Sequence, residues 1–248
     1  MAEKLRVGIF GRGRLGSAAA ALVGSAPDLE LAWVEGREAG PRSPVDVALD
    51  ASAAAAVEAH LAWARDARVD FVIGTTGWPI SVLGEAPRES GVMTAPNFSL
   101  AVAFARRVAL ALGRFAALDG AELAVLERHH GGKADAPSGT AKLLAEALVA
   151  GDPAYSGWTD KPRESGKIPV ASLRAGAEIG YHELRLEGAL ERIVFSHQAL
   201  SRELFAQGAL RALRWIHGRK GLFAFDDLAS ELLDGVFAAP GARAADPR

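Results

Sequence analysis

The sequence predicts a doubly wound α/β fold, in which helices cover both faces of a parallel sheet, followed by a second, mixed α+β domain. Short apolar runs alternate with helical segments up to residue 98, and from residue 99 that alternation stops and strand-like segments gather together. A glycine-rich turn also separates the first expected strand from the first expected helix. The 248 residues are enough for two domains of modest size.

Apolar runs predict the strands of the first half, because strands buried on both faces carry continuous apolar residues. The expected strands are residues 4–10, 29–34, 45–49, 69–73 and 92–94. Helices are expected between them at residues 16–24, 53–65 and 80–89. Strands that alternate with helices in this way are typical of a parallel sheet.

The second half has a different order of elements. Helices are expected at residues 99–117 and 140–149, and strands at residues 122–128, 168–174, 178–187 and 190–196. Two more helices follow at residues 202–217 and 226–233. The last stretch is rich in Pro, Gly and Ala, and we expect it to be disordered.

The composition excludes several kinds of function. There are no cysteines, which rules out disulfides, thiolate metal sites and cysteine nucleophiles. The 28 Lys and Arg nearly balance the 30 Asp and Glu, so the basic footprint of a nucleic-acid-binding protein is missing. No apolar run approaches the roughly 18 residues that cross a bilayer, and no targeting segment is visible. We expect a water-soluble, cytoplasmic protein without membrane or nucleic-acid partners.

The glycine-rich turn fits the pattern G-x-G-x-x-G, which binds the pyrophosphate of a dinucleotide at a helix N-terminus in Rossmann-like folds. Its residues are Gly11, Arg12, Gly13, Arg14, Leu15 and Gly16. Glu35 ends the second expected strand, where a carboxylate accepts hydrogen bonds from an adenosine ribose. Arg37 would pair with a 2′-phosphate that Glu35 would repel, so NADH and NADPH both remain open. The alternative is a glycine turn that binds nothing.

Two further loops follow expected strands at the carboxyl edge of the sheet, where open α/β sheets bind ligands. The first contains Gly74, Thr75, Thr76 and Gly77, and the second contains Ala95, Pro96, Asn97, Phe98 and Ser99. Small residues and hydroxyls in the first loop offer hydrogen bonds with little bulk. Taken singly, each loop also fits an ordinary connection, with Ser99 as the N-cap of the next helix.

The most informative segment runs from Glu127 to Thr140. His129 and His130 come off the end of an expected strand, so their side chains diverge and no shared metal site is expected. A histidine donates a proton near neutral pH, and Lys133 neutralises a carboxylate or a developing negative charge. Ser138, Gly139 and Thr140 open a helix and form an anion site suited to a carboxylate. The alternative is a set of solvent-exposed side chains with a helix cap.

Four more histidines carry less weight. His60 and His217 lie on amphipathic helices and are interpreted as surface residues. His182 and His197 lie in or beside strands, where they either belong to the core or support the site. A metal-dependent hydrolase built on the paired histidines would need a third ligand, which the spacing does not offer.

These motifs together resemble the dihydrodipicolinate reductase family. The longest, E-x-H-H-x-x-K-x-D-A-P-S-G-T-A, runs from Glu127 to Ala141, and H-x-A-x-x-R-x-x-F-A-x-G-A runs from His197 to Ala209. G-x-G-R-x-G, GTTG and APNFS complete the resemblance over essentially the whole chain. The chain departs from the family in a glycine turn shorter by one residue, an abbreviated segment after Glu35, and Ala101-Val102-Ala103 in place of Gly-Val-Asn.

The resemblance implies NAD(P)H-dependent reduction of 4-hydroxy-tetrahydrodipicolinate, a small dicarboxylate, to tetrahydrodipicolinate in lysine and diaminopimelate biosynthesis. It implies a dinucleotide-binding domain of residues 1–98 and 205–248, and a domain of residues 99–204 that binds substrate and builds a homotetramer. His129 would donate the proton and Lys133 would stabilise charge. The substrate carboxylates would be held by His130, Lys133, Ser138, Gly139 and Thr140. NADH or NADPH would contact Gly11, Gly13, Arg14, Leu15, Gly16, Glu35, Arg37, Gly74, Thr75, Thr76, Gly77, Ala95, Pro96, Asn97, Phe98, Arg202 and Phe205. The competing hypothesis is a non-catalytic dinucleotide sensor, which would have no use for the histidine and lysine segment.

Overall fold

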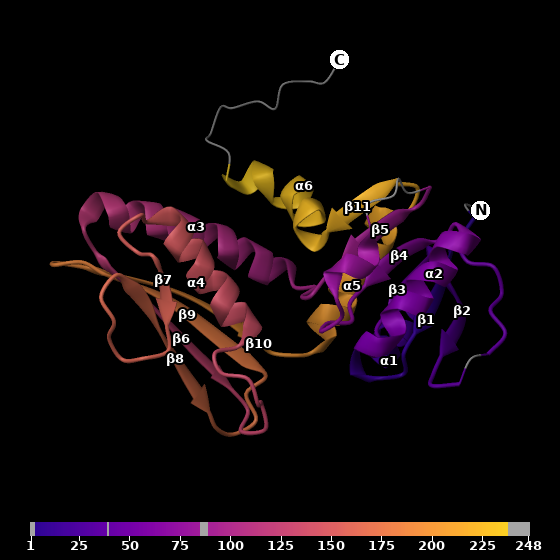
Figure 1. The fold of residues 1–248 in the computed structure, drawn as a ribbon, viewed down its shortest axis with the longest axis horizontal. Helices are drawn as coiled ribbons and strands as arrows, with labels where there is room; N and C mark the ends of the chain where they lie inside the picture. The colour runs from indigo at the N-terminus through magenta and orange to yellow at the C-terminus, as the bar shows by residue number, and fades with distance from the viewer. Residues whose placement is uncertain (1–2, 39, 85–88, 238–248) are drawn as a thin grey trace, which may run out of the picture. The chain divides into compact units, whose positions relative to one another are not determined.

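The computed structural model of the protein describes residues 3–38, 40–84 and 89–237. The chain forms two compact units, which we call unit 1 (Met1–Ser99 with Glu203–Arg248) and unit 2 (Leu100–Arg202). Figure 1 shows that both ends of the chain contribute to unit 1, while unit 2 is one continuous segment. The expected disorder of the C-terminal stretch concerns residues 238–248, which lie outside the described residues.

Unit 1 contains a six-stranded parallel sheet with the order β11-β5-β4-β3-β1-β2. Its strands are β1 (Leu5–Phe10), β2 (Leu29–Glu35), β3 (Val47–Asp50), β4 (Asp70–Ile73), β5 (Gly91–Thr94) and β11 (Gly221–Ala224). The chain passes from β1 to β2 on one side and then to β3 on the other. Open α/β sheets bind ligands at such a reversal, outside the carboxyl ends of the strands.

Helices cover both faces of this sheet (Figure 1). They are α1 (Arg14–Ser25), α2 (Val57–Ala67), α5 (Glu203–Ile216) and α6 (Phe225–Phe237). Val7 and Ile9 point into one core with α1 and α5, whereas Phe10 points into the opposite core with α2. Alternate residues of a strand face opposite sides, so one apolar run supplies both layers. The predicted doubly wound architecture is confirmed.

Two local expectations in unit 1 were wrong. Of the helix expected at residues 80–89, the described residues form a short 3₁₀ helix, Ile80–Leu83, which ends where Gly84 takes a left-handed φ of 63°, and residues 85–88 lie outside the described residues. The strand β11 was not expected, because Gly221–Ala224 is only four residues long and its pairing with β5 joins distant parts of the chain. For β11, a pairing with a distant part of the chain decided the structure.

Unit 2 contains a mixed five-stranded sheet with the order β10-β9-β6-β8-β7. Its elements are α3 (Leu100–Asp119), β6 (Glu122–His129), α4 (Gly139–Gly151), β7 (Gly157–Thr159), β8 (Lys167–Arg174), β9 (Gly180–Glu187) and β10 (Arg192–Ala199). The helices α3 and α4 pack together on one face of the sheet (Figure 1). They approach closely because Gly113 has no side chain, and a Cβ there would lie 2.3 Å from the Leu148 carbonyl oxygen. The expected second α+β domain is confirmed.

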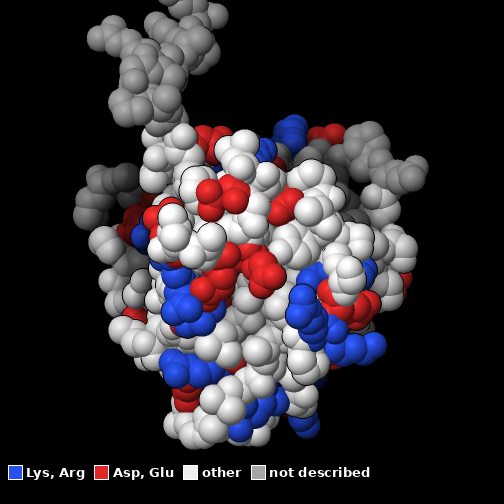
Figure 2. Space-filling view, turned by 90° about the vertical axis from the view of Figure 1, so that its left-hand side faces the viewer, with Lys and Arg blue, Asp and Glu red and all other residues white. Residues whose placement is uncertain are grey.

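The charges on the face shown in Figure 2 agree with the nearly balanced numbers of acidic and basic residues. Figure 2 shows one face of the molecule, where acidic and basic side chains are interspersed and neither sign covers the whole face. Within residues 3–38, 40–84 and 89–237, no helix combines the length and apolar character needed to span a bilayer.

Candidate functional site

The glycine turn after β1 is shaped by backbone contacts. Gly11 has a φ of 105°, and a Cβ there would lie 2.1 Å from the Ala51 carbonyl oxygen. A Cβ on Gly16 would lie 2.0 Å from the Gly11 carbonyl oxygen, so both positions require glycine. A Cβ on Gly13, in contrast, would meet no atom within 4 Å, and no side chain caps α1 there. The turn therefore leaves open space and unused N–H groups at a helix N-terminus, which suits a pyrophosphate.

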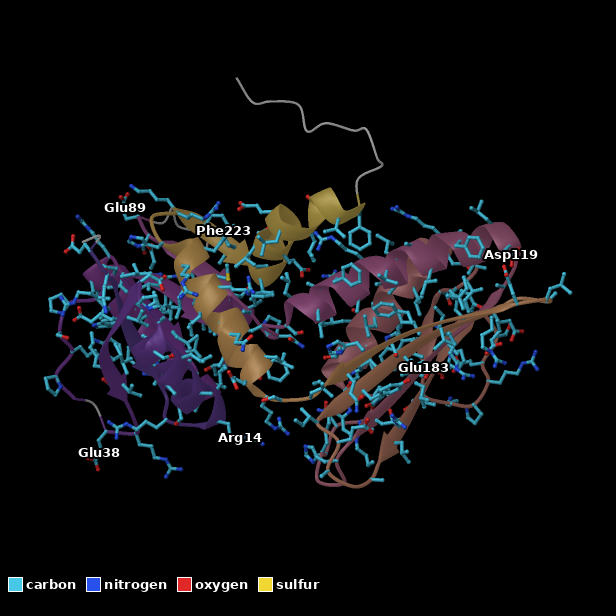
Figure 3. All side chains as sticks on the ribbon, turned by 180° about the vertical axis from the view of Figure 1, so that it is seen from behind. Arg14, Glu38, Glu89, Asp119, Glu183 and Phe223 are labelled. Atoms are coloured by element: carbon cyan, nitrogen blue, oxygen red, sulfur yellow. The ribbon has the colours of Figure 1, made fainter. Side chains whose placement is uncertain are left out.

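The arginines of this turn lie in different places. Arg12 Nη2 donates a hydrogen bond to the Val34 carbonyl oxygen at 2.9 Å, which places the guanidinium at the end of β2. Arg14 is the exposed first residue of α1, and Figure 3 shows it at that end of the helix. Arg37 and Glu38 are exposed in the loop after β2. Only Arg14 therefore lies where the pyrophosphate is expected.

Glu35 is paired with a residue that the sequence analysis missed. Arg42 donates from Nε and Nη2 to the two carboxylate oxygens of Glu35, at 2.7 and 2.8 Å. The Arg42 guanidinium also lies over the rings of Phe10 and Trp63, 4.8 and 5.1 Å from their centroids. The hydrogen bonds from Arg42 lower the pKa of the Glu35 carboxyl. Beside this pair lies a cavity of about 170 Å³, lined by Arg12, Trp33, Val34, Glu35, Gly36, Glu38, Gly40, Pro41 and Arg42.

Asp50, at the end of β3, anchors the loop of Gly74 and Thr75. Thr75 donates from Oγ1 to Asp50 Oδ1 at 2.5 Å, and Gly74 N donates to the Asp50 carbonyl oxygen at 2.8 Å. Burial alone would raise the pKa of the Asp50 carboxyl, but hydrogen bonds from His60, Thr75 and Ser52 outweigh it and lower the pKa. The Thr75 hydroxyl therefore holds the loop in place.

His60 was expected on the surface, and this was wrong. Its side chain is only 15% exposed, its Nδ1 lies 2.7 Å from Asp50 Oδ2, and its ring stacks on Phe10 with centroids 3.9 Å apart. The helical pattern placed His60 on α2 correctly but could not show that the carboxyl end of β3 lies against it.

The three loops expected to bind the dinucleotide meet in unit 1. A Cβ on Gly74 would lie 2.6 Å from Phe98 Cε2 and 3.3 Å from Leu15 Cδ2. The backbone of Phe98 packs still more closely on α5, where a Cβ on Gly208 would lie 1.8 Å from the Phe98 carbonyl oxygen. Phe205 is partly buried against the same core. Thr76, Gly77 and Pro96 are exposed, while Ala95 is buried and Asn97 accepts a hydrogen bond from Ser99 N at 2.8 Å.

In unit 2, the buried carboxylate of Glu127 connects His129, the N-terminus of α4 and Arg174. It pairs with His129 Nδ1, accepts from Arg174 Nη2 at 2.6 Å and Nη1 at 3.0 Å, and accepts from Ser138 N at 3.2 Å. Burial would raise the pKa of Glu127, but hydrogen bonds, first of all from Arg174, lower it. The carboxylate is therefore ionised at neutral pH although its side chain is 0% exposed.

His129 itself is buried, and burial lowers the pKa of its ring despite the hydrogen bond to Glu127. His182 lies edge-on to it, with ring centroids 5.2 Å apart, and His182 Nε2 lies 3.2 Å from Ser138 Oγ. Burial lowers the pKa of His182 to about 3, so this ring is neutral. His182 is therefore a buried neutral ring that contacts both His129 and Ser138. His197 stacks on the far side of His182, at 6.0 Å.

The remaining residues of the segment have separate partners. His130 Nε2 lies 3.2 Å from Arg202 Nη2, so the rings of His130 and His129 diverge as expected. Lys133 Nζ donates to Asp135 Oδ1 at 2.6 Å. Ser138 caps α4 by accepting a hydrogen bond from Ala141 N at 3.1 Å, and Gly139 and Thr140 form the first turn. Among the described residues, no cluster of three or more His, Asp or Glu side chains is arranged to hold a metal ion.

Two residues of this network were missed as site residues. Glu127 could have been found, because residues two apart on a strand share a face and Glu127 and His129 both belong to β6. Arg174 carries no such signal. It reaches Glu127 from β8, 47 residues away along the chain.

Comparison with known proteins agrees with this geometry. The family described as "Dihydrodipicolinate reductase, C-terminus" matches residues 98–229, and its N-terminal counterpart matches residues 39–98. The 4-hydroxy-tetrahydrodipicolinate reductase of Gluconobacter oxydans (strain 621H) is 38% identical over 244 residues, which are 90% of this chain and 96% of that protein. The enzyme of the same name from Acidiphilium cryptum (strain JF-5) is 36% identical over 241 residues, covering 90% and 97% of the two chains. The structure of dipicolinate-bound dihydrodipicolinate reductase from Paenisporosarcina sp. TG-14 has the same fold, with a TM-score of 0.74 at 23% identity over 91% of this chain and 99% of that one. The chain belongs to the dihydrodipicolinate reductase family.

Proposed function

We propose that this protein reduces 4-hydroxy-tetrahydrodipicolinate to tetrahydrodipicolinate with NADH or NADPH, in lysine and diaminopimelate biosynthesis. The observation that carries the proposal is the buried His129, held by Glu127 in the same network as the N-terminus of α4. A proton donor fixed beside an anion site is what the reduction of a small dicarboxylate requires. A protein that only sensed a dinucleotide would not need this network.

The dinucleotide is assigned to residues 1–98 and 205–248. The open position at Gly13 and the unused N–H groups of α1 fit a pyrophosphate, with Arg14 beside them. The remaining contacts are assigned to Leu15, the loops at residues 74–77 and 95–98, and the aromatic ring of Phe205. When bound, the nicotinamide supplies the hydride.

The substrate is assigned to residues 99–204. Ser138, Gly139 and Thr140 offer the first turn of α4 to one carboxylate, and Lys133 and His130 are assigned to the other. Arg202 reaches the same segment through His130. The C4 hydroxyl leaves as water before or during reduction, and the reduction of the resulting double bond adds a hydride to C4 of the ring and a proton to the adjacent carbon. The proton comes from protonated His129, or from a water that its Nε2 orients.

We also propose that the protein is a cytoplasmic homotetramer assembled through residues 99–204. Exposed apolar side chains on the face of this sheet opposite α3 and α4 support this, namely Leu173 on β8 and Val194 on β10. Exposed apolar side chains on one face of a sheet are typical of a surface that another protein chain covers.

The reaction is tested by following oxidation of NADH and, separately, NADPH with substrate made freshly from pyruvate and aspartate semialdehyde by a coupling synthase. Substrate-dependent oxidation establishes the activity, and the ratio of the two kcat/KM values gives the cofactor preference. If neither nucleotide is oxidised although both bind, the assignment is wrong.

Lys133→Ala should lower kcat/KM by roughly 10- to 150-fold, corresponding to ~1.5–3 kcal/mol for a hydrogen bond to a charged group. The ammonium would leave either a substrate carboxylate or the developing charge without a partner. Steady-state kinetics measures the change, and Lys161→Ala, an exposed lysine of unit 2, is the matched control. An unchanged kcat/KM would remove Lys133 from the site.

Arg42→Ala should weaken the binding of NADPH about tenfold relative to NADH. Arg42 neutralises both oxygens of Glu35, and without it an uncompensated carboxylate would repel a 2′-phosphate and accept the free ribose hydroxyls. Equilibrium binding of each nucleotide, without substrate, measures the ratio. Arg211→Ala, an exposed arginine on α5, is the control. A ratio equal to the parent's would assign the choice of nucleotide to Arg12 or Arg37 instead.

A further inference from the structure

His129 can act on a substrate only through the ring nitrogen that Glu127 does not occupy. Glu127 and His129 lie two residues apart on β6, and the Glu127 carboxylate meets His129 at Nδ1. An ionised carboxylate only accepts hydrogen bonds, so Nδ1 carries a proton in both charge states of the ring. The second nitrogen, Nε2, is then the one that gains and loses a proton.

The backbone of β9 leaves room beside that second nitrogen. Gly180 lies beside it, and a Cβ at this position would lie 3.0 Å from His129 Nε2 and 3.3 Å from Cδ2. Any side chain at residue 180 would therefore press on the reactive edge of the ring. Glu127 therefore fixes the Nδ1 side of the imidazole, and the missing side chain of Gly180 leaves space at the Nε2 side.

Arg174 shares the same carboxylate. Both of its terminal nitrogens donate to Glu127, and Nη2 also donates to the Asp135 carbonyl oxygen at 2.6 Å. The negative charge of Glu127 is thus divided between a permanent cation and the imidazole. Glu127 favours the protonated ring of His129, whereas Arg174 opposes it, both by its own charge and by engaging Glu127.

The other charged groups around His129 are few among the described residues. Lys133, from the loop after β6, disfavours the protonated ring and is itself paired with Asp135. His182, from β9, is neutral, and the half-buried His197 on β10 lies behind it. Glu127 is therefore the acidic side chain in direct contact with the ring.

We propose that Glu127 is a positioning residue that fixes the Nδ1-protonated form of His129, and that Arg174 holds this carboxylate in place and limits its effect on the ring. The proposal rests on the proposed function, in which His129 delivers the proton. Neither residue needs to touch the substrate, since both act through His129.

The test uses two substitutions that should have opposite effects. Glu127→Gln removes the negative charge but keeps a side chain of the same shape, so His129 should lose its proton at a lower pH. Arg174→Met removes the cation that opposes protonation, so His129 should lose its proton at a higher pH. Each shift should be about 0.5–1 pH unit, within the range by which protein surroundings move histidines.

Two readouts follow the pH at which His129 loses its proton. If Glu127 and Arg174 had a merely structural role, the two substitutions would not shift this pH in opposite directions. The first is the high-pH limb of kcat/KM, which reports the free enzyme's essential acid. The second is an NMR titration of His129 in the enzyme without ligands, in which ¹⁵N shifts also identify the protonated nitrogen. Glu127→Asp should bring the limb back toward the parent, and Glu187→Gln, a carboxylate at the other end of the same sheet, should leave it unchanged.

The proposal would be overturned by shifts in the same direction in both variants or by no shift in either. It would also be overturned if the neutral ring of His129 in the parent protein carried its proton at Nε2. Opposite NMR shifts with an unmoved kinetic limb would support the positioning pair and remove His129 from proton delivery, which separates this proposal from the proposed function. If Glu127→Gln does not fold, Arg174→Met alone tests the proposal. A His129 titration that moves to lower pH in this variant, or that stays in place, would contradict it.

Discussion

Replacing His129 by alanine should lower kcat by ~10²–10⁴-fold, the usual contribution of a general acid, with a smaller change in KM. The imidazole is buried and fixed by Glu127, so no neighbouring side chain can take its place. Lys133 is assigned to a substrate carboxylate and His182 is neutral, so neither is expected to replace His129 as the proton donor. Steady-state kinetics at saturating nucleotide measures the loss.

The matched control is His217→Ala, because this histidine lies just beyond α5 with about half of its side chain exposed. Nucleotide binding by His129→Ala should equal that of the parent, since the glycine turn belongs to unit 1 and His129 to unit 2. A kcat within twofold of the parent would reject His129 as the proton donor.

Glu127→Ala should reduce the free energy of unfolding by about 3–5 kcal/mol, the usual result of removing one partner from a buried ion pair. Arg174 would keep its charge without a carboxylate, and Ser138 N would lose its acceptor. Urea unfolding of parent and variant measures the difference. A loss below about 1 kcal/mol would mean that water replaces the carboxylate at little cost.

The double variant Glu127→Ala/Arg174→Ala is the control for this interpretation. Because it leaves no unpaired charge, it should be less destabilised than the sum of the two single variants. The difference in the free energy of unfolding between the parent and Glu127→Ala should also depend on pH. The pKa of Glu127 is lowered in the folded protein, so its contribution is fully present above the unfolded value of about 4.5 and is lost as the pH falls through the folded value.

The sequence predicted those parts of the site that depend on neighbouring residues. The glycine turn is specified by the positions of Gly11 and Gly16 relative to β1 and α1, and the SGT segment by its place at the start of α4. Both follow from local backbone geometry, which spacing along the chain encodes.

Residues that reach the site across the fold could not be predicted in this way. Arg42 and Arg174 are ordinary arginines in sequence, and their roles come from where a loop and a strand place them. His60 is the same case, because its partner Asp50 ends a strand that packs beside α2. Such contacts depend on tertiary packing, and no local periodicity reports them.

The insertion of unit 2 within unit 1 determines the order in which the protein can be completed during synthesis. Leu100–Arg202 leaves the ribosome as one continuous segment and has all of its own core residues available. Unit 1 must wait for α5, which supplies Ala206, Ala209 and Leu213 to its core, and for β11, which covers the edge of β5. The half assigned to the nucleotide is thus the last to be completed, although its glycine turn is made before unit 2.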